Sequence, residues 1–396
     1  MPRKDSESSV DSHGSCDSHD HEEDTSLKND AVVSKYLAAA EIANDVIKAV
    51  IAEVKEGAVV GDICTFGDKL INEKTSHLFK KNKNASVKGI AMPTCISVDS
   101  VICHYSPLKS EAPITLKNGQ VVKIDLGVHL DGFIASVAHT VVVGASKTNV
   151  VTGKIGDLIK ATYEGMEVAI RSLRPEKTNI EISNNIDKVA AEYGVTPIEN
   201  MVSHQIDKNE IDGEKQIVQN PGEKQLSEVT KIKIEPFEAY IIDVIYSTGK
   251  GKPKDLDTRT TVYKKNEAVQ YQLKMKASRT FIAESNKTCG YMPFSLRNFE
   301  DETKAKLGVV ECEKHGLLTP YPVLYEAQGE FVAQFKATVL VMANGLLKIT
   351  GLPFDSEVYQ SEKSIKNADL SQVLTSALKP KKKKKAAAAP AAATKA

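Results

Sequence analysis

The chain has 396 residues, of which 41% are hydrophobic and 26% are charged, and its formal net charge at pH 7 is zero. These proportions are ordinary for a soluble globular protein of one large domain or two smaller ones. No apolar run reaches the roughly 18 to 20 residues with which a helix spans a bilayer, so we expect no membrane partner. Residues 1–30 are too polar for a secretory signal, so we expect a cytoplasmic and nuclear protein with free cysteines.

The zero net charge hides a strong segregation of charge along the chain. Residues 1–30 hold nine acidic side chains against three basic ones, whereas residues 379–385 read KPKKKKK. A polar, acidic, Ser- and His-rich segment cannot bury enough apolar surface to fold, so 1–30 is predicted to be a disordered arm. We expect one folded domain over 31–365 and a lysine-rich tail over 366–396.

The first half of this domain begins with two helical patterns. Apolar residues recur at helical spacing over 36–54, and Gly57 is expected to end that helix. Asp62 is expected to cap a second helix. The apolar side of this second helix is expected to hold Cys64, Phe66, Leu70 and Ile71.

Strand and helix patterns then alternate to the end of the domain. Strands are predicted at 95–102, 120–130, 133–143, 238–247, 331–341 and 346–349, and helices at 156–173 and 181–192. This mixture predicts an α+β or α/β fold. The stretch VVKIDLG at 121–127 is echoed by YIIDVIYSTG at 240–249, which indicates either a weak internal repeat or chance, because apolar strands with an aspartate are common.

Asp131-Gly132 lies between two strand patterns and predicts a hairpin with a type I′ turn. In that register Asp125 lies opposite Ala138, and Asp125 and Ser136 are diagonal neighbours on one face of the sheet. An acidic residue inside an apolar strand is costly unless it is paired. Asp125 is therefore either part of a functional site or a buried aspartate held by hydrogen bonds.

Five phrases occur in the order and spacing of the motifs of type-two methionine aminopeptidases: CISVDSVICHYSP, VVKIDLGVHLDGFIASVAHT, MVSHQID, AYIIDVIYSTGKG and VAQFKATVLV. The resemblance covers roughly residues 32–355. It implies an α+β pita-bread fold, with two related αβ halves around a curved antiparallel sheet. It also implies a type-two helical insertion at about 250–328.

Carried over by position, the metal ligands of that family would correspond to Asp125, Ser136, His204, Asp243 and Lys336. His104 matches the substrate-binding histidine, and Asp212 stands where active members have a second histidine. Active members have aspartate at 136 and glutamate at 243 and 336. Two dications need bridging carboxylates, and an ammonium repels them. We therefore expect no metal, no cofactor and no catalytic residue, with Lys336 paired to Asp125 or Asp243. An active metallo-aminopeptidase is the less favoured alternative.

Further phrases narrow the resemblance to the proliferation-associated proteins of the ErbB-receptor-binding and curved-DNA-binding type, which are non-peptidase homologues. These phrases include HYSPLKS at 104–110, YQLKMK at 271–276 and GVVEC at 308–312. The resemblance implies binding to ribosomes and structured RNA, and roles in ribosome assembly, translation and growth regulation. It leaves a DNA-binding transcription co-regulator as the alternative, and it implies protein partners of unknown identity.

Three basic clusters favour binding to a polyanion, although each could be a solvated charged face. The first includes Lys250, Lys252, Lys254, Lys264, Lys265, Lys274 and Lys276, with Tyr263 and Tyr271 available to stack on bases. The second includes Lys80, Lys81, Lys83 and Lys88. The third is Lys381, Lys382, Lys383, Lys384 and Lys385, which also resembles a nuclear or nucleolar address. Without an RNP signature or zinc finger, we expect recognition of shape and phosphate.

Overall fold

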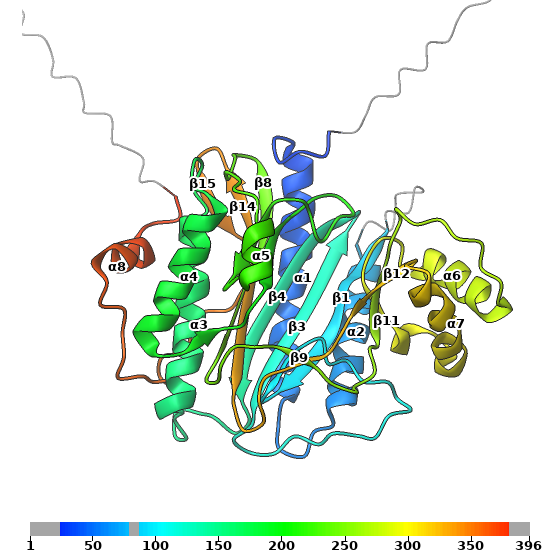
Figure 1. The fold of residues 1–396 in the computed structure, drawn as a ribbon, viewed down its shortest axis with the longest axis horizontal. Helices are drawn as coiled ribbons and strands as arrows, with labels where there is room; N and C mark the ends of the chain where they lie inside the picture. The colour runs from blue at the N-terminus through cyan, green and yellow to red at the C-terminus, as the bar shows by residue number, and fades with distance from the viewer. Residues whose placement is uncertain (1–23, 79–86, 380–396) are drawn as a thin grey trace, which may run out of the picture.

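The computed structural model describes residues 24–78 and 87–379 and is built around a nine-stranded antiparallel sheet (Figure 1). The strand order is β1-β3-β4-β14-β8-β6-β7, with β15 beside β14 and β5 beside β8. The strands are β1 (Lys88–Val98), β3 (Val121–Leu130), β4 (Phe133–Val142), β5 (Thr196–Pro197), β6 (Met201–Ile206), β7 (Gln216–Gln219), β8 (Glu238–Ser247), β14 (Val332–Met342) and β15 (Gly345–Lys348).

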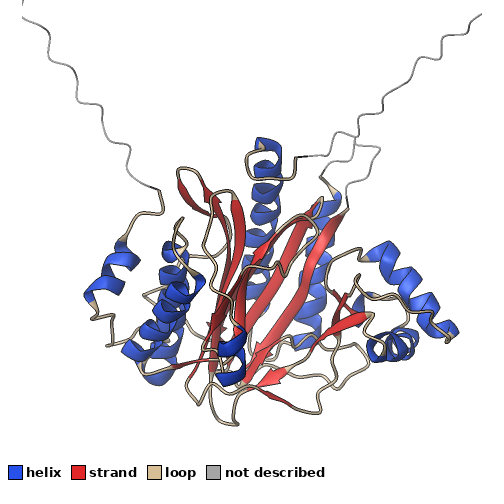
Figure 2. Ribbon diagram, turned by 45° about the horizontal axis from the view of Figure 1, so that its top comes forward, coloured by secondary structure: helices blue, strands red, loops and turns tan. Residues whose placement is uncertain are grey.

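Two pairs of helices cover the two halves of this sheet (Figure 2). The helices α1 (Asp30–Glu53) and α2 (Val60–Ser76) pack against β1, β3 and β4. The helices α3 (Gly153–Ser172) and α4 (Asn179–Tyr193) pack against the half that contains β8, β14 and β7, and α8 (Ala368–Thr375) lies on α3. Each half therefore has its own apolar core. Among the described residues no helix is long and apolar enough to cross a membrane.

The predicted helices are present, but their starts and apolar faces differ in detail. Helix α1 is capped by the Asn29 side chain and ends at Glu53, before the left-handed turn at Gly57. Helix α2 begins at Val60, so the prediction that Asp62 caps it is wrong; Asp62 lies in the first turn. Phe66 is 37% exposed and lies off the buried face. That face instead includes Ile63, Cys64 and Ile71.

The predicted hairpin of β3 and β4 is confirmed. Asp131 and Gly132 have φ values of 55° and 82°, as a type I′ turn requires. A Cβ on Gly132 would lie 2.3 Å from the side chain of Asn209, so glycine is also needed for packing. The register places Asp125 opposite Ala138, as predicted.

The single strand predicted at 95–102 is interrupted by a turn. Asp99 adopts a φ of 49°, and its carboxylate accepts hydrogen bonds from the Val121 amide and the Gln120 side chain at 2.9 and 3.1 Å. β1 therefore ends at Val98. The chain continues as β2 (Val101–Cys103) in a small sheet of order β2-β13-β9, with β9 at Lys254–Asp255 and β13 at Leu324–Tyr325.

The segment between β8 and β14 adds a second small sheet, β11-β10-β12, and two helices at one side of the molecule (Figure 1). Its elements are β10 (Val262–Lys265), α6 (Lys276–Thr288), β11 (Phe294–Ser295), the 3₁₀ helix η1 (Leu296–Asn298), α7 (Glu302–Lys314) and β12 (Leu318–Tyr321). Phe281, Phe294 and Phe299 pack together in its core. Arg297 fastens it to the main domain through a buried ion pair with Asp68 of α2, at 2.5 Å.

Candidate functional site

One row of residues crosses five neighbouring strands of the large sheet. Cys95 pairs with Asp125, Asp125 with Ala138, Ala138 with Lys336, and Lys336 with Asp243. Residues directly opposite each other in antiparallel strands present their side chains on the same face. Because Ala138 has only a methyl group, the long side chain of Lys336 has room to reach across β4 toward Asp125.

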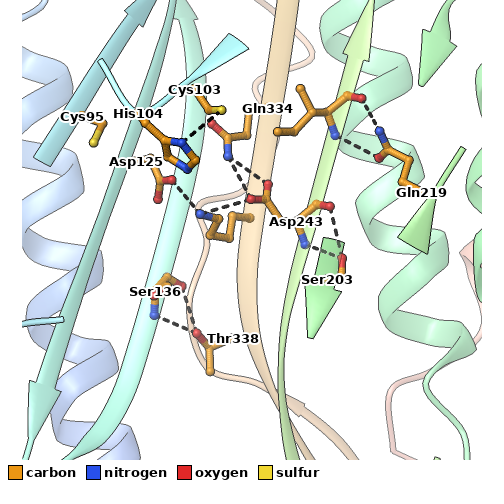
Figure 3. A network of polar contacts seen from close by, with 12 residues as sticks. Cys95, Cys103, His104, Asp125, Ser136, Ser203, Gln219, Asp243, Gln334 and Thr338 are labelled. Carbon is orange, nitrogen blue, oxygen red and sulfur yellow. Dashed lines mark hydrogen bonds and ion pairs between the residues drawn. The ribbon is translucent and has the colours of Figure 1, made fainter. Parts of the chain in front are cut away.

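Lys336 forms ion pairs with both aspartates of this row. Its Nζ atom lies 2.6 Å from Oδ2 of Asp125 and 3.1 Å from Oδ2 of Asp243, and Figure 3 draws these contacts as dashed lines. The lysine side chain is only 12% exposed. The prediction that Lys336 pairs with Asp125 or Asp243 is confirmed, and the structure shows that it pairs with both.

Burial disfavours the charged form of Lys336, but the two carboxylates outweigh this effect and raise the pKa of its ammonium above the ordinary value. Burial also raises the pKa of Asp243, and the nearby Asp125 carboxylate adds to the rise, whereas Lys336 opposes it. Lys336 is therefore a fixed positive charge between two acidic groups.

Asp243 is held by two further neighbours that the sequence analysis did not identify (Figure 3). The Gln334 side chain donates to both carboxylate oxygens of Asp243 at 3.0 Å, and the Ser203 hydroxyl accepts the Asp243 amide at 2.9 Å. Gln334 precedes Lys336 by two positions on β14, so strand alternation alone places both side chains on one face. That spacing is the signal that could have found Gln334.

Ser136 lies on β4 opposite Gly127, on the same face as Asp125, as predicted. Its amide donates to the Thr338 hydroxyl at 2.9 Å, and its carbonyl accepts from the hydroxyls of Thr338 and Thr350 at 2.9 and 2.7 Å. Its own buried hydroxyl has no hydrogen-bond partner among the described residues. Ser136 thus joins β4 to β14 through its backbone, while its side chain supplies no anion to the site.

His104 and His204 line a cavity of about 330 Å³ beside the ion pair. The Nδ1 atom of His104 lies 3.1 Å from the Pro322 carbonyl, and that of His204 lies 3.3 Å from the Gln205 carbonyl. Burial lowers the pKa of each histidine to about 4. Both imidazoles are therefore neutral at pH 7. Other residues that line the cavity are Ser136, Asp212, Asp243 and Lys336.

Asp212, at the position of the second family histidine, lines the same cavity and forms an ion pair with Lys264 of β10. This contact joins the loop after β6 to the small sheet. It also engages a lysine that the sequence analysis assigned to nucleic acid. Lys264 is therefore engaged within the protein, and its contact with nucleic acid stays a prediction.

The residues of this site do not fit the two-metal centre that the fold family implies. Among the described residues, no group of three or more His, Cys, Asp or Glu side chains is placed to hold a metal ion. The Lys336 ammonium bonds the oxygens of Asp125 and Asp243 that a dication would need. A cation in that position repels a dication, and Ser136 adds no compensating negative charge.

The predicted basic residues differ in their exposure and their contacts in the structure. Lys250, Lys252, Lys254, Lys274 and Lys276 are exposed, and none forms an ion pair within the described part of the chain. Lys265 is half-buried, 3.3 Å from Glu267. Lys88 donates to the Leu78 carbonyl. Lys80, Lys81, Lys83 and Lys381 to Lys385 lie outside the described residues.

Neither predicted stacking tyrosine is available as expected. Tyr263 is 3% exposed and packs in the core of the inserted segment, so the prediction that it stacks on bases is wrong. Tyr271 stacks on His315 with ring centroids 3.8 Å apart, which covers one face of its ring. Any nucleic-acid contact by this segment therefore depends on charge more than on these rings.

Residues 34–272 match the model of metallopeptidase family M24. The chain is 44% identical to ErbB-3 binding protein 1 of Arabidopsis thaliana over 370 residues, which cover 93% of this chain and 91% of the relative. It is 38% identical to the curved DNA-binding protein of Schizosaccharomyces pombe, over 90% of this chain and 93% of the relative. A solved structure of a thermophilic Arx1 superposes with a TM-score of 0.83 at 31% identity, over 89% of this chain and all of that one.

The chain therefore belongs to metallopeptidase family M24, and the pita-bread fold predicted from its motifs is confirmed. Within that family it is similar to proteins of the ErbB-3-binding and curved-DNA-binding type, as the sequence predicted. The names of these two relatives do not describe peptidases.

Proposed function

We propose that this protein is a non-peptidase member of family M24 that binds ribosomes and structured RNA. The ion pairs of Lys336 with Asp125 and Asp243 support the loss of peptidase chemistry most directly. They place a positive charge where the family reaction needs dications. The lysine and the two aspartates neutralise one another, which stabilises that arrangement. Peptide hydrolysis by the metal-dependent route of the family then has neither its metals nor a carboxylate at 336.

RNA binding is supported by the exposed lysines of the segment after β8. Lys250, Lys252 and Lys254 alternate with Gly251 and Pro253, and all three lysines are exposed. Lysines that contact a phosphate backbone release counterions, so they give binding that weakens steeply with salt. The resemblance to proliferation-associated proteins supports ribosomes and ribosomal RNA as the targets, with roles in ribosome assembly, translation and growth control.

Co-sedimentation with ribosomes over a series of KCl concentrations tests this proposal. We expect the wild-type chain to pellet with ribosomes at low salt and to dissociate as salt rises. Reversal of Lys250, Lys252 and Lys254 to glutamate should abolish pelleting at moderate salt. The matched control reverses Lys69, Lys147 and Lys177, which are exposed but ion-paired. Equal loss in both triple variants, or no binding by the wild type, would refute the proposed surface.

A DNA-binding role is the second candidate, because the Schizosaccharomyces pombe relative is named a curved DNA-binding protein. The same lysines serve either polymer, since phosphate contacts carry no sequence information. Competition between a curved DNA duplex and a folded RNA of equal length, in the same salt, separates the two. Preference for RNA supports the ribosomal role, and preference for curved DNA supports a transcription co-regulator.

The place of action in the cell and the protein partners are also part of the proposal. Lys381–Lys385 support passage through the nucleus and nucleolus as well as the cytoplasm. The Arabidopsis relative is named for binding a protein, which supports a protein partner for this chain as well. Imaging of a tagged chain with and without residues 379–396 tests the nuclear part: loss of nuclear signal is expected on deletion.

A further inference from the structure

A buried glutamate lies directly beneath the basic loop at 247–254. Glu326 is 5% exposed, and its Oε2 atom accepts hydrogen bonds from the Ser247 hydroxyl at 2.8 Å and the Gly251 amide at 2.7 Å. Its Oε1 atom accepts the Ala327 amide at 2.8 Å. Among the described residues no cation lies within ion-pair distance of this carboxylate. The carboxylate is therefore held by hydrogen-bond donors, two of which belong to the loop.

The loop is shaped closely around this carboxylate. A Cβ on Gly249 would lie 2.9 Å from Cδ of Glu326 and 2.8 Å from Cγ of Glu330, so a side chain there would displace the loop. Gly251 has a φ of 70°, and a Cβ on it would lie 2.5 Å from the Pro197 carbonyl. The two glycines that flank Lys250 are thus required by contacts beneath the loop.

Both ends and the middle of the loop are fixed. Ser247 pairs with Val332 at the end of β8, and Lys254 pairs with Tyr325 in β9. At the centre, the Gly251 carbonyl accepts the Glu199 amide at 2.7 Å, while its amide bonds Glu326. Lys250 and Lys252 flank this doubly bonded glycine. Their backbone positions are therefore set before any ligand arrives.

We propose that Glu326 is a positioning residue of the RNA-binding surface, which holds the loop at 247–254 so that Lys250, Lys252 and Lys254 meet the phosphate backbone of folded RNA in a preformed arrangement. This inference rests on the proposed function. Ordering a lysine-bearing loop at the moment of binding costs conformational entropy, and a loop ordered in advance avoids that cost. Asp255, beside Lys254, leaves residues 250–255 with an excess of positive charge.

The test measures fluorescence anisotropy of a labelled double-stranded RNA stem with the full chain at several KCl concentrations. The plot of log K against log salt has a negative slope. Replacing Lys250, Lys252 and Lys254 by glutamine should make that slope shallower, by about 1 for each lysine. Glu326→Ala keeps all three lysines, yet should weaken binding roughly fivefold through loss of loop order. Gly249→Ala should weaken it similarly, because it displaces the loop while keeping the carboxylate.

Controls separate a positioning effect from a general loss of structure. Glu238→Ala removes another buried carboxylate away from the loop, and Gly61→Ala adds a Cβ in ordinary contact, 3.7 Å from Pro107. Both should bind RNA as the wild type does. Hydrogen exchange should show faster exchange at the Gly251 amide in Glu326→Ala, with the large sheet unchanged. If Glu326→Ala and Gly249→Ala bind normally while the lysine variant does not, the inference fails and the proposed function stands. If the wild type binds no RNA, the proposed function itself fails.

Discussion

Lys336 and Asp125 form a buried ion pair 2.6 Å long, between strands separated in the sheet by β4. Ala138 lies between them in the row and leaves space for the lysine side chain. The same ammonium bonds Asp243 on its other side. A lysine at 336 therefore joins β3 and β8, which lie in the two halves of the sheet.

Removing the lysine charge should destabilise the fold strongly. Lys336→Met leaves Asp125 and Asp243 buried without their cation, so we expect the free energy of unfolding to fall by about 3 to 5 kcal/mol. Urea denaturation at pH 7 measures this change. Lys336→Arg keeps the charge and should cost much less, and an equal loss in both variants would show that shape, not charge, decides stability here.

Exchanging the cation for carboxylates should restore affinity for metal. In the double variant Ser136→Asp with Lys336→Glu, two acidic groups join Asp125, His204 and Asp243, which together supply oxygen and nitrogen ligands for divalent ions. We expect Mn²⁺ to raise the melting temperature of the double variant and to leave that of the wild type unchanged. The melting temperature of Ser136→Asp alone should not respond to Mn²⁺, because Lys336 still forms ion pairs with Asp125 and Asp243.

The buried histidines should make the fold sensitive to mild acid. Burial lowers the folded-state pKa of His204 to about 4, below its unfolded value of about 6.5. Between these values the unfolded chain binds the extra proton, so stability is present above pH 6.5 and is lost as pH falls toward 4. At pH 5 the loss is roughly 2 kcal/mol for this histidine. Urea denaturation at pH 7 and pH 5 measures the free energy of unfolding at each pH. The difference between the two values should be smaller in His204→Gln than in the wild type, and an unchanged difference would contradict a buried neutral imidazole.

The inserted segment should open more readily when the ion pair between Arg297 and Asp68 is removed. Arg297 donates to the Asp68 carboxylate, to the Ser106 hydroxyl at 2.8 Å and to the Pro107 carbonyl at 3.1 Å. Arg297→Met leaves Asp68 buried without a counter-charge, so a loss of about 3 to 5 kcal/mol is expected. Hydrogen exchange should accelerate first in α6 and α7. Uniform acceleration across the large sheet would instead mean that the segment does not open independently.

The fold and the central ion pair were predictable because their signals are local in the sequence. Asp131-Gly132 determines the hairpin register, and the register places Asp125 and Ser136 on one face. A lysine at 336 then lies beside the aspartates of neighbouring strands, and its buried charge needs one of their carboxylates as a partner. The motifs around these residues also identify the family, which supplies the order of the strands.

Other contacts could not be predicted, because they join segments with no shared pattern. Lys264 and Asp212 are 52 residues apart, and their pairing depends on how the small sheet docks on the large one. The burial of Tyr263 depends on the packing of the inserted segment around β10, a strand whose sequence places two lysines directly after the tyrosine. Glu326 is a single acidic residue in an unremarkable stretch, and only the structure places it beneath the lysines at 250–254.

A peptidase assay on the wild-type chain tests most directly whether the Lys336 ammonium excludes metal-dependent peptidase chemistry from this site. The chain is incubated with Co²⁺ or Mn²⁺ and a Met-Ala-Ser peptide, and release of free methionine is followed beside an active methionine aminopeptidase. The charge of Lys336 predicts no release above the background without protein at either metal. Metal-dependent release of methionine that disappears in His204→Gln would contradict the account.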